Sequence, residues 1–133
     1  PSAARGGGLL GAAAASLDTR RTIIDFTTGG RLSKTWVDAM ARHSEATSTR
    51  EAFAAYLRAW AKADFHEAVI GNKTPIKVIV GEYDGAINAE TMRATFLQWF
   101  PNAVLETIAN AGHYPMNETP VALATSIENF LRG

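Results

Sequence analysis

The sequence predicts a mixed α/β protein in which a helical segment precedes a β-α-β-α unit with two parallel strands. Residues 1–71 are rich in alanine and show apolar residues at helical spacing, without strand signals. From residue 72 onward, two short runs rich in β-branched residues alternate with two helical patterns. We therefore expect a helical part over residues 1–71, with a flexible N-terminus, and an α/β part over residues 72–133.

Composition excludes several classes of function. The chain has 133 residues and is 47% hydrophobic, which suits one globular domain. Thirteen basic and thirteen acidic side chains cancel, so we expect neither nucleic acid nor a membrane as a partner. No apolar run approaches the roughly 20 residues that cross a bilayer, and we expect a cytoplasmic protein. The absence of cysteine excludes disulfides and thiolate chemistry.

The N-terminal residues carry two weak signals. The glycine run Gly6–Gly8 lacks the lysine and hydroxyl of a phosphate-binding loop, so it predicts only flexibility. The short apolar patch over residues 9–15 is similar to the core of a signal peptide. Pro1 as the first residue and the glycine-rich approach argue against that interpretation.

Three amphipathic helices are expected in the first part. Asp18 is the predicted cap of a helix over residues 19–28 that stops at the Gly29-Gly30 pair. Ser33 is expected to cap the second helix. Ser48, with a glutamate three residues later, has the spacing of a reciprocal cap for the third.

The third helix carries an apolar stripe of large residues, namely Phe53, Tyr56, Leu57 and Trp60. Trp36 adds a further large side chain, and three short helices cannot fully bury so many large side chains against one another. Mutual core packing is the favoured interpretation, and the lining of a ligand cavity is the alternative.

The second part alternates strands and helices. Residues 76–81 read as a strand buried on both faces, and residues 104–108 as a second strand. Asn88 is expected to cap a helix over residues 89–99, and Thr119-Pro120 to cap and open the last helix. A strand-helix-strand crossover of this kind is right-handed and places both strand ends at one edge of the sheet.

Two residues at that edge have the chemistry of an acid and a base. Asp84 follows the first strand directly, and His113 follows the second by a few residues. Neighbouring strands lie about 4.8 Å apart, so short loops can bring a carboxylate against an imidazole. Asp84 would then fix the tautomer of His113, and His113 would act as general base and then acid.

Each residue alone also fits a structural role. Asp84-Gly85 is a favourable turn pair, and a loop histidine often makes only structural hydrogen bonds. His43 and His66 fall in helical segments without such a partner, so we read them as surface or packing residues. Three irregularly spaced histidines show no metal-ligand spacing, and we expect no metal and no cofactor.

These motifs resemble the C-terminal part of the α/β-hydrolase family. The resemblance covers about residues 72–133 and rests on Gly-Glu-Tyr-Asp at residues 81–84, Trp-Phe-Pro-Asn-Ala at 99–103 and Ala-Gly-His-Tyr-Pro-Met-Asn-Glu-Thr-Pro at 111–120. It implies a partial α/β-hydrolase fold with Asp84 as the triad acid, His113 as the triad base and residues from about 9 to 68 as a helical cap over the acyl pocket. It also implies that Glu118 and Pro120 shape the last helix and do not react.

The family's nucleophile is not found in this sequence. That nucleophile sits on a Gly-x-Ser-x-Gly turn between a strand and a helix. None of the six serines has glycines two residues to either side, and no site matches an aspartate nucleophile or the oxyanion-hole segment. We therefore expect the chain alone to be nearly inert, and to assemble with another copy or with the missing N-terminal half.

Two functions of different classes follow. The first is a serine esterase-like hydrolase acting on a small-molecule substrate, to which this chain contributes the acid and the histidine. The second is a non-catalytic oligomeric or ligand-binding module derived from the same fold.

Overall fold

A computed structural model describes residues 16–133. The chain is mixed α/β and mostly helical, with two parallel strands in an open sheet. The described residues form two compact units: residues 16–25 together with Gly30–Asp64, and Phe26–Gly29 together with Phe65–Gly133. The predicted glycine run at residues 6–8 and the apolar patch at 9–15 lie outside the described residues.

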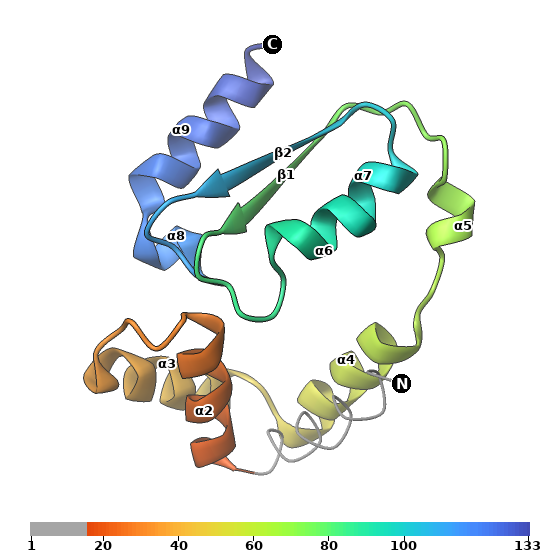
Figure 1. Cartoon of the computed structure of the whole chain (residues 1–133). Coiled ribbons are helices and arrows are strands. Elements are labelled where there is room, and N and C mark those ends of the chain that lie inside the picture. Colours follow the sequence, from red (N-terminus) through yellow and green to blue (C-terminus); the bar gives the residue numbers. More distant parts are fainter. Residues whose placement is uncertain (1–15) are drawn as a thin grey trace. The chain divides into compact units, whose positions relative to one another are not determined.

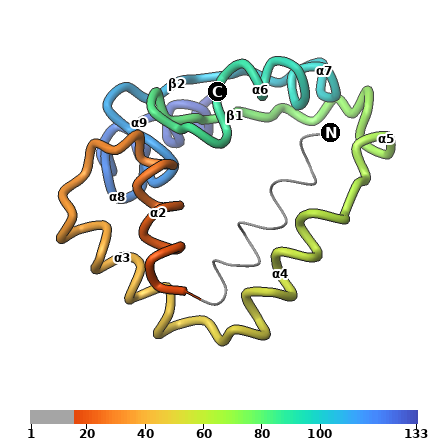
Figure 2. Tube along the Cα trace, turned by 60° about the horizontal axis from the view of Figure 1, so that its bottom comes forward, coloured from red at the N-terminus to blue at the C-terminus, as the bar shows by residue number. Residues whose placement is uncertain are grey.

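The first unit is built on helices α2 (Leu17–Thr27), α3 (Lys34–Thr47) and α4 (Arg50–Lys62), whose chain path Figure 2 follows. The end of α2 is where the glycine pair predicted it, because Gly29 and Gly30 take left-handed φ angles of 69° and 64°. Ser33 caps α3 as predicted, since its hydroxyl accepts a hydrogen bond from the amide of Trp36 at 3.2 Å.

The predicted cap of the third helix is wrong by one residue. The hydroxyl of Thr49 accepts from the amide of Ala52 at 3.1 Å, so Thr49 caps α4. Ser48 instead ends α3, where its hydroxyl donates to the carbonyl of Ser44 at 2.5 Å. Ser48 is already engaged with the helix before it, which leaves the capping role to Thr49.

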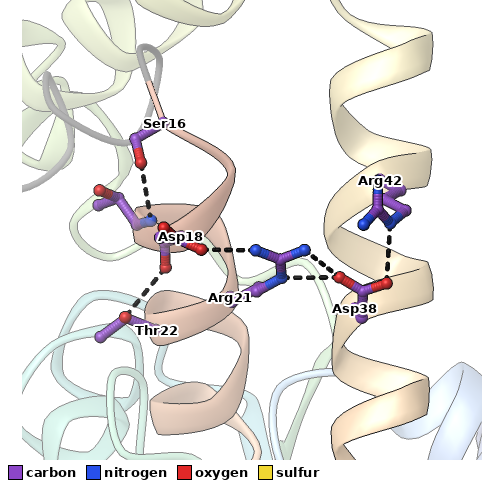
Figure 3. A network of polar contacts seen from close by, with 7 residues as sticks. Ser16, Asp18, Arg21, Thr22, Asp38 and Arg42 are labelled. Carbon is purple, nitrogen blue, oxygen red and sulfur yellow. Dashed lines mark hydrogen bonds and ion pairs between the residues drawn. The ribbon is translucent and has the colours of Figure 1, made fainter.

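Charged side chains join α2 to α3 (Figure 3). Arg21 pairs with Asp38 on α3 and with Asp18 on its own helix, and Arg42 reaches Asp38 at 2.8 Å. Arg42 and then Arg21 lower the pKa of the Asp38 carboxyl, because both donate hydrogen bonds to its charged form. These side chains are partly exposed, so the network fixes the pairing of the helices more than it stabilises the fold.

A buried arginine organises the interior of the first unit. Arg20 is 5% exposed, donates to the hydroxyl of Ser44 at 2.6 Å and lies 4.5 Å from the ring centroid of Phe53. Tyr56 and Trp60 on α4 remain 80% and 67% exposed. The prediction that the aromatic stripe packs into a mutual core is therefore wrong for these two residues.

The second unit centres on strands β1 (Ile76–Gly81) and β2 (Ala103–Ile108), which follow helix α5 (His66–Val69). The strands pair in parallel, from Ile76 opposite Ala103 to Gly81 opposite Ile108, so both end at one edge as predicted. They run side by side in Figure 1 and Figure 2. The prediction of a strand buried on both faces is wrong, because only Val80 and Gly81 of β1 are buried in this two-stranded sheet.

Helices lie on both sides of this strand pair (Figure 1): α6 (Ala89–Ala94) and α7 (Phe96–Trp99) on one, and α9 (Pro120–Leu131) on the other. Asn88 caps α6 as predicted, but the expected continuous helix breaks at Thr95, with φ −125° and ψ −91°. The Thr95 hydroxyl donates to the carbonyl of Thr91 at 2.7 Å, and this local bond competes with helix continuation.

Polar contacts attach α9 to the sheet. Lys77 on β1 forms an ion pair with Glu106 on β2, and the buried Ser126 of α9 donates its hydroxyl proton to Glu106 at 2.9 Å. Lys77, and to a smaller extent Ser126, lowers the pKa of Glu106. Thr119 occupies the N-cap position of α9 and Pro120 opens the helix, as predicted, but the Thr119 hydroxyl makes no capping bond and is buried without a hydrogen-bond partner.

Replacing Gly81 with alanine should destabilise the second unit strongly. A Cβ atom at Gly81 would lie 2.1 Å from the carbonyl oxygen of Gly112 and 2.6 Å from that of Ala111, so backbone must move. We expect a loss of about 3 kcal/mol in the free energy of unfolding, measured by urea denaturation. Gly85→Ala is the control, because its nearest contact is the movable ring end of Phe26 at 2.9 Å. Equal losses for the two variants would contradict this packing.

Candidate functional site

The loop after β1 holds the Asp84 carboxylate in a fixed and buried position. Asp84 lies three residues past the end of β1, and its Oδ1 accepts hydrogen bonds from the amides of Ala86 at 2.8 Å and Ile87 at 2.9 Å. This is the turn that Asp84-Gly85 predicted. The side chain is only 5% exposed. One carboxylate oxygen is thus engaged by the backbone, and the other is left for a further partner.

That partner is His113. Its Nδ1 lies 2.7 Å from Oδ2 of Asp84, so the structure brings the two predicted residues into hydrogen-bond contact. An ionised carboxylate only accepts hydrogen bonds, which assigns the proton to Nδ1. Within residues 16–133, no hydrogen bond to Nε2 is recorded, and 38% of the side chain is exposed. In the neutral form of the ring, Nε2 is then an acceptor that is not engaged by the carboxylate.

Backbone hydrogen bonds bind the two loops to each other. The amide of Glu82 donates to the carbonyl of Ile108 at 3.0 Å, and that of Tyr83 to the carbonyl of Ala111 at 2.8 Å. Glu82 also accepts from the amide of Asn110 at 3.0 Å through its carboxylate. Asn110 takes a left-handed φ of 58°, which asparagine tolerates better than most residues. The strand pairing thus continues into the loops that carry the acid and the base.

The backbone at the end of α2 contacts the loop that carries the histidine. The amide of His113 donates to the carbonyl of Thr27 at 3.0 Å. Gly112 permits this approach, because a Cβ atom there would lie 2.7 Å from both the Thr27 carbonyl oxygen and the Thr28 Cα. Thr27 and Thr28 are both buried. The glycine before the histidine is therefore needed to seat the histidine backbone.

Tyr114 packs beside the imidazole. The two ring centroids are 5.5 Å apart and the rings meet edge to face, at 81°. Burial raises the pKa of the Tyr114 hydroxyl, a side-chain hydrogen bond with Thr27 lowers it, and the charges of Asp84 and Glu118 raise it further. The phenol is therefore neutral near pH 7, and we assign it a packing role against the histidine.

The other two histidines lie where they were expected. His43 is exposed on α3. The His66 ring lies 5.4 Å from that of Trp99 and packs against it. These surface and packing interpretations are confirmed.

Every serine that the structure describes has a structural hydrogen bond. Ser16 and Ser33 accept from backbone amides near helix starts, whereas the remaining three bond to charged side chains: Ser44 and Ser48 to Arg20, and Ser126 to Glu106. None of them has a recorded contact with His113. A serine nucleophile for the histidine is therefore not found among residues 16–133.

One contributor to this site was misread from the sequence. Glu118 was expected to shape the last helix, yet its carboxylate accepts hydrogen bonds from the amides of Gly112 at 2.9 Å and Tyr114 at 3.1 Å. The sequence signal was its place five residues after the histidine, within a turn bounded by Pro115 and Pro120. Glu118 thus holds the loop that carries the histidine.

Neither a metal site among the described residues nor a similar known protein indicates a function for this chain. Within the described part of the chain, no group of three or more metal-ligating side chains is found, and no helix is long and apolar enough to span a membrane. Comparison with family models, curated proteins and solved structures finds no match to this chain. The function is therefore argued from the geometry of the site.

The arrangement has the parts needed for proton transfer. A buried carboxylate fixes the imidazole tautomer, and the opposite ring nitrogen is free to accept a proton. The same carboxylate would stabilise the imidazolium that forms. The predicted contact is present, whereas the catalytic role of the two residues stays a prediction.

Asp84→Asn should reverse the tautomer of His113. The two amides of Ala86 and Ile87 require an oxygen at the Oδ1 position, so the new NH2 group must face Nδ1 and donate to it. The ring proton then moves to Nε2. Nitrogen-15 NMR shifts of the imidazole distinguish the two tautomers directly.

Asp18→Asn is the control for this prediction, because Asp18 is exposed on α2. It should leave the His113 nitrogen shifts unchanged. A His113 ring that keeps its proton on Nδ1 in Asp84→Asn would show that the carboxylate does not set the tautomer.

Proposed function

We propose that this chain supplies the acid and the base of a serine esterase-like hydrolase, an α/β-hydrolase of which it forms the cap and the C-terminal portion. One observation carries the proposal. A buried carboxylate, held by two amides, orients a histidine whose other ring nitrogen is unengaged. A purely structural histidine in a loop has no need of this arrangement.

The proposed chemistry follows from the protonation state. Nε2 of His113 accepts the hydroxyl proton of a serine as that serine attacks the carbonyl carbon of an ester. The imidazolium then protonates the leaving alcohol, and the same histidine activates the water that releases the acid. Asp84 stabilises the imidazolium through its hydrogen bond with Nδ1.

The nucleophile and the oxyanion donors are proposed to come from outside the described residues. The described serines are committed to structural bonds, and two strands leave an open sheet. We propose that a second copy or an N-terminal half of the protein completes the sheet beside β1 or β2. Small-molecule esters are the proposed substrates, and no metal or cofactor is required for this reaction.

A non-catalytic binding or oligomeric module is the second candidate. It is favoured by the exposed Tyr56 and Trp60 on α4. It is also favoured by a hollow of about 440 Å³ in the first unit, lined by Arg21, Thr22, Asp25, Lys34, Val37 and Asp38. A hollow of this size suits a small ligand, and its walls carry charges of both signs.

His113→Ala should greatly slow covalent labelling of the complete gene product by a fluorophosphonate, a reagent that traps activated serines. We expect the labelling rate to fall about 100-fold or more, because general-base catalysis is lost. His43→Ala is the matched control, because His43 is an exposed histidine of α3. This variant should be labelled at the same rate as the unaltered protein. Equal labelling of all three proteins would count against the triad role.

The two candidates also differ for the 133-residue chain by itself. Under the hydrolase proposal, this chain hydrolyses an ester no faster than buffer alone does. Its mass by light scattering should exceed that of one chain, because the unpaired edges of the sheet can pair with strands of another chain. A well-folded monomer without turnover would contradict the assembly part of the proposal. That result would favour an autonomous binding module.

A further inference from the structure

We infer that Glu118 is a positioning residue for His113. This inference rests on the proposed function, which makes His113 the base. It is carried by a separate observation, because the Glu118 carboxylate bridges the two backbone amides on either side of the histidine, at Gly112 and Tyr114.

The bridge leaves the His113 backbone little freedom. Oε2 of Glu118 accepts from Gly112 at 2.9 Å and Oε1 accepts from Tyr114 at 3.1 Å, so both oxygens of one carboxylate are engaged. The amide of His113 itself donates in another direction, to the carbonyl of Thr27 at 3.0 Å. Three consecutive amides are thus each fixed by an acceptor, and the imidazole is aimed by its backbone as well as by Asp84.

The short helix α8 (Pro115–Glu118) sets the position of this carboxylate. The amide of Glu118 donates to the carbonyl of Tyr114 at 2.9 Å, while its carboxylate accepts from the amide of the same residue. Pro115 opens this turn, and Pro120 opens α9 directly after it. The bonds form a small closed ring that holds the glutamate in the turn.

An ionised carboxylate suits this place better than any neutral side chain. It offers two equivalent acceptor oxygens, and hydrogen bonds to a charged acceptor are stronger than those to a neutral one. A glutamine offers one oxygen and would turn its NH2 group toward the second amide, so that two donors face each other. The requirement for glutamate is therefore chemical as well as steric.

Amide hydrogen exchange on the full chain tests this inference without any need for catalysis. In Glu118→Gln, exchange at one of the two amides, Gly112 or Tyr114, should speed up about tenfold or more, and in Glu118→Ala exchange at both should do so. Exchange in β1 and β2 should change less than twofold. Glu128→Gln, an exposed glutamate of α9 paired with Arg132, is the matched control and should leave both amides protected.

A kinetic readout on the complete gene product separates positioning from mere stability. If Glu118 aims the base, Glu118→Gln should lower kcat for ester hydrolysis about tenfold while KM stays within twofold. Unchanged protection of both amides in Glu118→Gln and Glu118→Ala would overturn the inference, as would an unchanged kcat. Should the unaltered protein show no hydrolysis at all, the proposed function fails, while the exchange result still decides whether Glu118 holds the loop.

Discussion

The hydrogen bond between Asp84 and His113 is the constraint on which the functional account depends. The two residues are 29 positions apart in the sequence, and their side chains meet at 2.7 Å because two parallel strands end at the same edge. Burial of the carboxylate and hydrogen bonds from two backbone amides fix the position of the acid independently of the histidine. The imidazole is thus oriented by a carboxylate whose own position is fixed.

Close backbone contact makes this constraint precise. Gly81, the last residue of β1, lies against the carbonyl of Gly112 in the loop after β2. Gly112 in turn lies against the carbonyl of Thr27. Only glycine leaves room for these approaches. The Glu82 carboxylate then accepts from the amide of Asn110, and the Glu118 carboxylate accepts from the amides of Gly112 and Tyr114, which flank His113. Small residues set the distances, and acidic side chains hold the loop at those distances.

Much of this could be predicted from the sequence because the signals are local. β-branched runs marked the two strands, Gly29-Gly30 marked a helix end, and the positions of Asp84 and His113 after the strands indicated their meeting. The errors have physical causes. Thr95 breaks a helix through a side-chain bond, and β1 lacks the neighbours that would bury both of its faces.

The role of Glu118 could not be predicted because it depends on how a turn folds back across six residues, which no periodicity shows. The exposure of Tyr56 and Trp60 is likewise set by which surfaces are available to α4. Local patterns thus placed the acid and the base, whereas the contacts that support them required the three-dimensional structure.

The most direct test is a proton NMR spectrum of the unaltered chain in water, searched for the Nδ1 proton of His113. A proton shared between an imidazole and a buried carboxylate resonates far downfield of the backbone amides. We expect one such signal, which is absent from His113→Ala and retained in His43→Ala. A folded protein with no downfield signal over the whole pH range of its stability would contradict the pairing of Asp84 with His113.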